Sequence, residues 1–207
     1  MKKDSKSHLK REKNILYTGF GDKGTTTLFN CKQERVSKSA NVIEALGSVD
    51  ELNAYIGLVK VYTSSKEFKI KSKSKNISYS ETLDRIQQVL FIIQAELAGS
   101  DMTVPKGEVT KIENLINSIG DLLPPITSFT ISGGTVASAS LDVSRTLARR
   151  SERRIVSVLD EGIRKIGPET ISYMNRLSSV LFALSRYANH LASVEEEHPT
   201  YLKKNKK

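Results

Sequence analysis

A long helix rich in arginine is predicted from Ser132 to Val156. At 3.6 residues per turn, its apolar stripe is interrupted where Arg150 and Arg154 fall. Burying a guanidinium group without a partner is costly, so an anionic group should meet the helix at these positions. Carboxylates of another segment or a polyphosphate could each meet that need. The alternative is a solvated arginine face with i,i+4 ion pairs, which accounts for most arginine-rich helices.

Four other stretches carry apolar residues at three- and four-residue steps, which predicts helices over residues 41–63, 81–99, 108–122 and 169–194. Ser80 is a candidate N-cap for the helix at 81–99, and two prolines after residue 123 should end the helix at 108–122. The last helix has an apolar seam typical of helical bundles, made of Met174, Leu177, Leu181, Leu184, Ala188 and Leu191. A second, mostly polar line lies beside it, made of Asn175, Ser179, Phe182, Arg186 and Asn189. That line could face a ligand or a subunit boundary, or it could be an ordinary polar flank.

A glycine-rich segment, ILYTGFGDKGTTTLFN, precedes the first helix at residues 15–30. Gly19, Gly21 and Gly24 match the dinucleotide-binding pattern G-x-G-x-x-G, but a β-branched threonine run follows where that pattern requires a helix. We therefore reject a dinucleotide site. Glycines let the backbone approach a ligand closely, and Lys23 and the threonine hydroxyls can donate to phosphate oxygens. A glycine-rich turn between two short strands is the alternative.

Two side chains stand out against their surroundings. Asp50 lies in the middle of the helix at 41–63 rather than in its first turn, so either an arginine partner or exposure to solvent is expected. Phe129 lies in a polar, β-branched loop just before the arginine-rich helix. It could plug the core beneath that loop, or it could project into a pocket.

The 207 residues fit one domain, which we assign to residues 15–194. Residues 1–13, 66–75 and 203–207 each carry a net charge of +4, whereas the whole chain carries only +9. The remainder is slightly acidic, which gives little support for a nucleic-acid groove. Segments 1–14 and 195–207 are predicted to be a disordered basic tail and a frayed charged tail, and 64–79 a mobile connector rich in lysine and serine.

Composition argues against several classes of protein. No apolar run approaches the roughly 18 residues of a membrane span, and no signal-peptide core follows the start. Cys31 is the only cysteine, so no internal disulfide is expected and a reducing compartment is the default. His8, His190 and His198 have no cysteine or acid at ligand spacing, so we expect no zinc site, and no serine or cysteine triad can be assembled.

Four blocks, taken together and in this order, resemble the ATP:cob(I)alamin adenosyltransferases of the propanediol-utilisation (PduO) type. The blocks are YTGFGDKGTTTLF at 17–29, VIEALGSVDELNAYIGL at 42–58, SGGTVASASLDVSRTLARRSERRIV at 132–156 and NRLSSVLFALSRYAN at 175–189. The resemblance implies an all-α, up-down five-helix bundle with left-handed packing and a glycine-rich N-terminal segment. It also implies a homotrimer with active sites between subunits. The family moves the 5′-deoxyadenosyl group of ATP onto the cobalt of cob(I)alamin or cob(I)yrinic acid a,c-diamide and releases triphosphate.

The resemblance further implies roles for individual residues. The triphosphate would be wrapped by Thr18, Gly19, Gly21, Lys23 and Thr26. The rest of the ATP site would come from Arg149, Arg150, Glu152 and Asn175, with Arg149 lent by a neighbouring subunit. Asp50 would pair with Arg145 across the interface, and magnesium would be bound through ATP rather than by the protein. Phe129 would press on the lower face of the corrin and keep the lower ligand of cobalt away, and Arg186 and Asn189 are also expected on the corrinoid side.

Gly19, Leu46, Ser132 and Ser179 depart from the family's usual basic residue, Tyr, Pro and Asp. They put local contacts in doubt but leave the main site residues in place, so we expect an active enzyme. Two alternatives stay open: a helical nucleic-acid-binding module and a low-activity adenosylcobalamin carrier. We expect the cytoplasm, or alternatively the mitochondrial matrix, and a reductase and an adenosylcobalamin-dependent enzyme as possible partners, with no specific nucleic acid and no membrane.

Overall fold

The computed structural model describes residues 16–29, 34–64, 68–71 and 76–201. Within these residues the helices are α1 (Asn41–Tyr62), α2 (Tyr79–Leu97), α3 (Lys106–Gly120), α4 (Val136–Asp160) and α5 (Pro168–Leu191). The strands are β1 (Thr25–Thr27), β2 (Arg35–Ser37), β3 (Lys69–Lys71) and β4 (Asn76–Ser78). The prediction of an all-α chain with five helices and a glycine-rich N-terminal segment is confirmed, and no described helix is long and apolar enough to cross a membrane.

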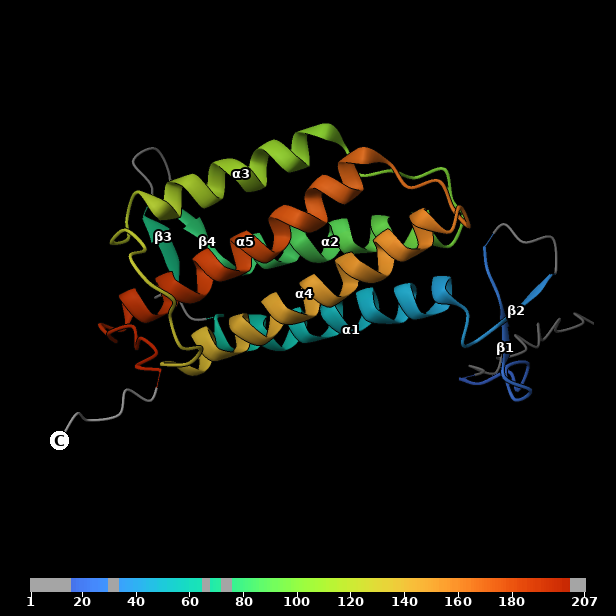
Figure 1. Cartoon of the computed structure of the whole chain (residues 1–207), viewed down its shortest axis with the longest axis horizontal. Coiled ribbons are helices and arrows are strands. Elements are labelled where there is room, and N and C mark those ends of the chain that lie inside the picture. Colours follow the sequence, from blue (N-terminus) through green and yellow to red (C-terminus); the bar gives the residue numbers. More distant parts are fainter. Residues whose placement is uncertain (1–15, 30–33, 65–67, 72–75, 202–207) are drawn as a thin grey trace, which may run out of the picture.

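The arginine-rich helix α4 lies at the centre of the packing. It contacts α1 on one side and α5 on the other, while α2 packs against α1 and α3 packs against α5 (Figure 1). The predicted seam of α5 is buried, with Met174, Leu177, Leu181 and Leu184 fully inaccessible to water. The core therefore forms where the apolar stripes of the helices meet, as their three- and four-residue spacing requires.

Side chains from other helices fix where the helices begin. The buried carboxylate of Glu96 in α2 accepts hydrogen bonds from Gly167 N (2.7 Å) and Thr170 Oγ1 (2.5 Å) at the start of α5, where an acid is favoured by the helix dipole. The helix predicted to start after Ser80 begins two residues earlier, with Ser78 as its N-cap. The reason is Tyr79, which is fully buried and donates a hydrogen bond from its hydroxyl to Leu184 O (2.9 Å).

The connector predicted at 64–79 contains an ordered hairpin in the part that the structure describes. Lys69–Lys71 pairs with Asn76–Ser78 in an antiparallel register, and Ile70 is fully buried. Phe68 also packs edge-on against Tyr79, with 5.5 Å between the ring centroids. The lysine- and serine-rich composition conceals these apolar anchors, and the predicted mobility of residues 65–67 and 72–75 lies outside the described residues.

The two predicted tails differ in how much of each the structure describes. The predicted basic tail at 1–14 lies outside the described residues, whereas the tail predicted to fray after residue 194 is described as far as Tyr201. There it contacts the loop between α3 and α4, so the frayed-tail prediction is wrong for this part. The β1–β2 hairpin lies beyond the end of the bundle at which α1 begins, and β3–β4 lies at the opposite end (Figure 1).

Candidate active site

The glycine-rich segment forms consecutive tight turns immediately before β1. Asp22 N donates to Gly19 O (3.2 Å), and Gly24 N donates to Gly21 O (3.1 Å). Gly19 and Gly24 have φ angles of +70° and +72°, in the left-handed region that side chains with a Cβ rarely adopt. These turns precede the β1–β2 hairpin instead of joining its two strands.

Arg35 of β2 holds these turns in place through hydrogen bonds. Its Nε donates to Thr25 Oγ1 (2.7 Å), and its Nη2 donates to Thr25 O (2.8 Å) and to Phe20 O. Two backbone carbonyls of the segment are thereby tied to one guanidinium group. Thr18 and Lys23, two of the predicted phosphate ligands, are exposed on this braced segment.

Lys38, at the end of β2, lies against the glycine turns. Its backbone N–H donates to Gly24 O (2.9 Å), and a Cβ added to Gly21 would lie 2.8 Å from its Nζ. The Lys38 ammonium group thus packs closely against Gly21, and a Cβ there would require this flexible side chain to shift. Sequence reasoning missed Lys38. The signal that could have indicated Lys38 is its position directly after a strand that pairs with the threonine run.

The glycine segment and the arginine-rich helix meet at a cavity of about 630 Å³. It is lined by Thr26, Lys38, Ile43, Glu44, Gly47, Ser48, Glu51, Arg150 and Arg154. Arg150 forms an ion pair with Glu51 of α1, and Arg154 Nη2 lies 4.0 Å from Glu44 Oε2. The anionic partners expected for these arginines are therefore carboxylates of α1. The cavity also gathers three cationic groups and two hydroxyls, a donor set suited to phosphate oxygens.

Other predicted nucleotide ligands lie on the side of α4 that faces α5. Glu152 accepts a hydrogen bond from Asn175 Nδ2 (3.0 Å), and the Arg145 guanidinium carbon lies 5.9 Å from the centre of the Phe182 ring. Arg149 lies between Arg145 and Glu152 on this side of the helix and is exposed. A single chain thus presents its predicted ATP ligands on two sides of α4. One group adjoins α1 and the glycine segment, and the other adjoins α5.

The predicted pair of Asp50 and Arg145 does not form within one chain. Asp50 accepts a long hydrogen bond from Gln94 Nε2 of α2 (3.4 Å), whereas Arg145 Nε lies 3.4 Å from the buried carboxylate of Asp142 in its own helix. Asp50 also lines a second cavity, of about 350 Å³, together with Thr26 and Thr27. The pairing across a subunit interface stays a prediction.

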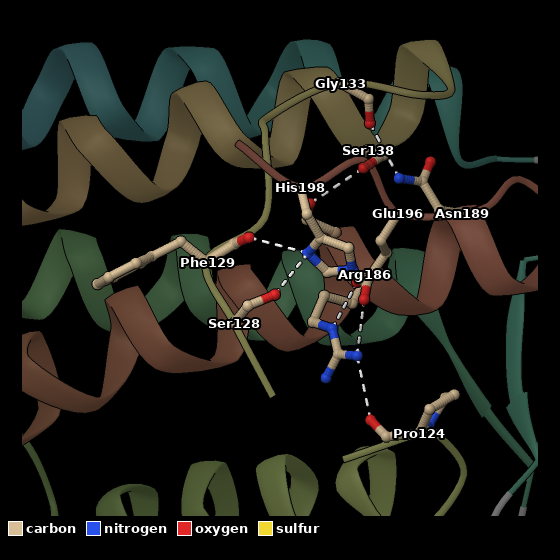
Figure 2. Close-up of polar contacts among 10 residues, drawn as sticks. Pro124, Ser128, Phe129, Gly133, Ser138, Arg186, Asn189, Glu196 and His198 are labelled. Atoms are coloured by element: carbon tan, nitrogen blue, oxygen red, sulfur yellow. Dashed lines mark hydrogen bonds and ion pairs between the residues drawn. The ribbon is translucent and has the colours of Figure 1, made fainter. Parts of the chain in front are cut away.

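Phe129 projects from the loop between α3 and α4, and its side chain is 80% exposed (Figure 2). Of the two possibilities for this ring, the core plug is therefore wrong. Arg186 and Asn189, predicted on the corrinoid side, are both buried and bonded to the protein itself. Arg186 pairs with Glu196, and Asn189 Nδ2 donates to Gly133 O (2.9 Å). Within this chain both side chains hold the Phe129 loop, and their contact with the corrinoid stays a prediction.

Among the described residues, no group of three His, Cys, Asp or Glu side chains is arranged to hold a metal ion. The family model for cobalamin adenosyltransferases matches residues 16–188, which include all five helices except the last three residues of α5. The chain belongs to the cobalamin adenosyltransferase family. The four sequence blocks that resemble this family lie inside the matched range except for Asn189, the last residue of the fourth block, so the family prediction is confirmed.

Relatives of this chain within the family come from bacteria and mammals. The corrinoid adenosyltransferase PduO of Citrobacter freundii is 37% identical over 183 residues, which cover 84% of this chain and 50% of that protein. The corrinoid adenosyltransferase of Bacillus subtilis is 31% identical over 179 residues, which cover 84% of this chain and 86% of the relative. The human corrinoid adenosyltransferase MMAB is 31% identical over 183 residues, which cover 84% of this chain and 68% of the human protein. The chain thus spans about half the length of the PduO proteins that it matches.

Solved structures of similar proteins agree with this assignment. A variant of the PduO-type ATP:corrinoid adenosyltransferase from Lactobacillus reuteri, complexed with cobalamin and ATP, superposes with a TM-score of 0.79 at 28% identity, covering 90% of this chain and 97% of that one. Another variant of the same enzyme, complexed with ATP, superposes with a TM-score of 0.77 at 29% identity, covering 89% and 99% of the two chains. The adenosyltransferase fold therefore extends over nearly all of the chain described here.

Proposed function

We propose that this protein transfers the 5′-deoxyadenosyl group of ATP to the cobalt of cob(I)alamin, with adenosylcobalamin and triphosphate as products. The observation that carries the proposal is the cavity at which Thr26 of the glycine segment meets Lys38, Arg150 and Arg154. Family membership supports it, as do similar solved structures that bind ATP and cobalamin. Basic groups beside the glycine segment suit a triphosphate.

The chemistry needs few protein groups. The electron pair of cob(I) attacks the 5′ carbon, the bond from that carbon to the triphosphate oxygen breaks, and the electrons leave on the triphosphate. Cobalt supplies the nucleophile, so no general base is required, which agrees with the absence of a predicted triad. The tasks left to the protein are to orient the 5′ carbon and to stabilise charge on the leaving group. Removing one such electrostatic donor typically costs about 2.7–4 kcal/mol of transition-state stabilisation.

Each predicted ligand has a task in this scheme. The exposed Lys23 and the turns at Gly19 and Gly21 would bind the triphosphate from one side. A displaced carboxylate would free Arg150 for a phosphate oxygen, because its present partner Glu51 is half exposed and such pairs are weak. Asn175 and Glu152 already bind each other and would present one polar edge to the nucleotide. Magnesium would arrive with ATP.

We further propose that the site is completed between copies of the chain in a homotrimer. Arg149 and the glycine segment lie on different sides of α4, so one chain does not line a single pocket with both. Apolar side chains around the glycine segment are also left exposed: Leu16, Tyr17, Phe20 and Phe29. A neighbouring chain that covered this segment would bury them and could supply Arg149. Asp50 and Arg145 are not paired with each other within one chain, and they would then meet across the contact between two chains.

The corrinoid is proposed to bind beside the Phe129 loop. An exposed aromatic ring on a loop held by buried side chains is suited to pressing on a flat macrocycle and keeping a lower cobalt ligand away. The nucleic-acid alternative is less favoured, because the positive charge of the chain is concentrated in residues 1–13, 66–75 and 203–207 and the remainder is slightly acidic. A carrier of adenosylcobalamin would use the same pocket and differs only in turnover. We retain the cytoplasm as the proposed compartment, with a reductase and a client enzyme as partners.

An anaerobic assay with ATP and cob(I)alamin tests the proposal by following loss of the cob(I) absorbance. We expect turnover by the wild type and a loss of about 10²–10³ in kcat for Arg149→Ala, as for a leaving-group donor. Arg153→Ala, one turn further along α4 and also exposed, is the matched control and should keep near-normal kcat. A folded wild-type protein without turnover would overturn the proposed enzymatic activity. If that protein still bound adenosylcobalamin tightly, the result would favour the carrier alternative.

A further inference from the structure

The loop that carries Phe129 has no helix or strand of its own. It runs from the end of α3 at Gly120 to the start of α4 at Val136. Four of its residues are exposed in succession from Ile126 to Phe129. The position of the exposed ring therefore depends on the hydrogen bonds that hold the backbone of this loop. Figure 2 shows several of them.

Helix α5 holds the two ends of the loop. Arg186 Nη2 donates to Pro124 O (3.1 Å) near the beginning. One turn later, Asn189 Nδ2 donates to Gly133 O (2.9 Å), and its Oδ1 accepts from Thr135 N (3.0 Å) near the end. None of these bonds involves residues 125–132, so α5 alone does not position Phe129.

The chain after α5 holds the middle of the loop. Ile131 N donates to Glu197 O (2.7 Å), and His198 Nδ1 lies 2.9 Å from both Ser128 Oγ and Phe129 O. A carbonyl oxygen can only accept, so His198 Nδ1 must carry the proton for the bond to Phe129. The backbone of Phe129 is thus bonded directly to His198, a side chain of the C-terminal segment 195–201 that lies 69 residues further along the chain.

An ion pair between the buried Arg186 and the partly buried Glu196 holds that C-terminal segment against α5. Arg186 Nε donates to Glu196 Oε1 (2.5 Å) and Arg186 Nη2 donates to Glu196 Oε2 (2.8 Å), in the bidentate geometry that suits this pair. The Arg186 residue is only 8% exposed, and the same Nη2 also donates to the loop at Pro124. One guanidinium group therefore joins the helix, the loop and the C-terminal segment.

We propose that Glu196 and His198 are positioning residues for Phe129, with His198 setting the direction of the ring through the backbone carbonyl. The inference rests on the corrinoid role proposed for Phe129. An exposed ring makes few contacts of its own, so the region that it can reach is set by the direction of its Cα–Cβ bond, which follows from the loop backbone. A misplacement of about 1 Å at a reacting centre can reduce a rate as much as 10²-fold. The acidic C-terminal segment is therefore part of the corrinoid site rather than a tail.

A fluorescence experiment tests the positioning without reference to activity. The sequence contains no tryptophan, so Phe129→Trp introduces a single reporter at the ring itself. In that background we expect His198→Ala to increase the mobility of the indole, measured as a lower fluorescence anisotropy at unchanged lifetime. Glu197→Ala is the matched control, since Glu197 contributes its backbone carbonyl and its side chain is exposed. Equal anisotropy in the His198→Ala protein and its parent would overturn the inference.

Two conservative replacements separate the hydrogen bond from general packing. The amide nitrogen of an asparagine stands at the same distance along the side chain as His198 Nδ1, whereas that of a glutamine stands one bond further. We expect His198→Asn to restore the ordered reporter and His198→Gln to behave like His198→Ala. If both replacements leave the indole as mobile as in His198→Ala, the Nδ1 bond does not position the ring.

Steady-state kinetics of proteins that retain Phe129 then test whether the position of the ring affects turnover. We expect His198→Ala to lower kcat/KM for the corrinoid about three- to tenfold, as for one lost hydrogen bond, and to leave KM for ATP within twofold. In a Phe129→Ala protein the same change should have less than a twofold effect, because His198 acts through the missing ring. Equal losses in both backgrounds would contradict the inference. An inactive wild type would overturn the proposed function instead, while the anisotropy result would still decide the positioning.

Discussion

Asn189 of α5 accepts two hydrogen bonds from Thr135, the N-cap of α4, at 3.0 Å from its backbone nitrogen and 3.2 Å from its hydroxyl. Through this amide, the beginning of the arginine-rich helix is tied to the helix beside it. The contact also explains Gly134, since a Cβ there would lie 2.5 Å from Asn189 Oδ1 and its φ is +93°. One polar side chain thus orders the end of the Phe129 loop and the start of α4 together.

We predict that Asn189→Ala lowers the free energy of unfolding by about 2–4 kcal/mol. The change removes three hydrogen bonds at a buried position and leaves the Gly133 carbonyl and the Thr135 N–H without this partner. Urea unfolding followed by circular dichroism measures the loss. Asn117→Ala, at an exposed position in α3, is the control and should change stability by less than about 0.5 kcal/mol. Equal stability of the two variants would contradict the role given to Asn189.

Acid stability should depend on Glu108. Two hydrogen bonds from Arg85, opposed by burial and assisted by Lys111, hold the pKa of the Glu108 carboxyl below its ordinary value. The unfolded chain therefore binds this proton more readily than the folded one. Glu108 contributes its full stability above the unfolded pKa of about 4.3 and loses it as the pH falls through the lower folded pKa.

Glu108→Gln should accordingly reduce the stability difference between pH 7 and pH 3, by about 1–2 kcal/mol for a pair whose arginine is half exposed. Thermal unfolding at a series of pH values measures this difference. Glu113→Gln is the control, since Glu113 pairs with Arg176 in a half-exposed ion pair with both partners near the surface. If stability fell as steeply with decreasing pH in Glu108→Gln as in the wild type, another group would be responsible for the acid dependence of stability.

Lys38→Met should weaken ATP binding. The change keeps an unbranched side chain of similar size beside Gly21 but removes the charge of the lysine that lines the cavity of the glycine segment. A charge-assisted contact is worth about 1.5–3 kcal/mol, so we expect KM for ATP to rise roughly 10- to 100-fold, with KM for the corrinoid unchanged. Steady-state kinetics measure both constants, and Lys165→Met, at an exposed position outside the helices, is the control. A rise confined to the corrinoid KM would place the phosphates elsewhere.

Phe129→Ala should distinguish two forms of the corrinoid. If the ring keeps a lower ligand away from cobalt, its loss slows turnover at least tenfold when the substrate is cob(II)alamin with a reductant, because reduction requires that ligand to be absent. Turnover of preformed cob(I)alamin should fall far less. Side-by-side anaerobic assays compare the two, with Ile126→Ala, another exposed apolar residue of the same loop, as the control. Equal losses with both substrates would exclude this role for Phe129.

The helices and the family could be predicted from the sequence because their signals are local. Apolar residues at three- and four-residue steps define α1 and α5 to within three residues at each end, and the seam that they predict in α5 is buried. Consecutive residues in four blocks were enough to indicate the adenosyltransferase family. The family resemblance also predicts Thr26 and Arg150 as ATP ligands, and both line one cavity.

Contacts between distant segments could be decided only by the tertiary structure. Arg150 needed an anionic partner, but that this partner is Glu51, 99 residues away, follows from how α1 packs on α4. Lys38 has no distinguishing neighbours in sequence and acquires its place only because β2 pairs with the threonine run. The charged C-terminal segment reads as solvated from composition alone, yet a buried arginine provides its partner. Periodicity records which face of an element is apolar, whereas a polar side chain can bond wherever the chain brings a partner within about 3 Å.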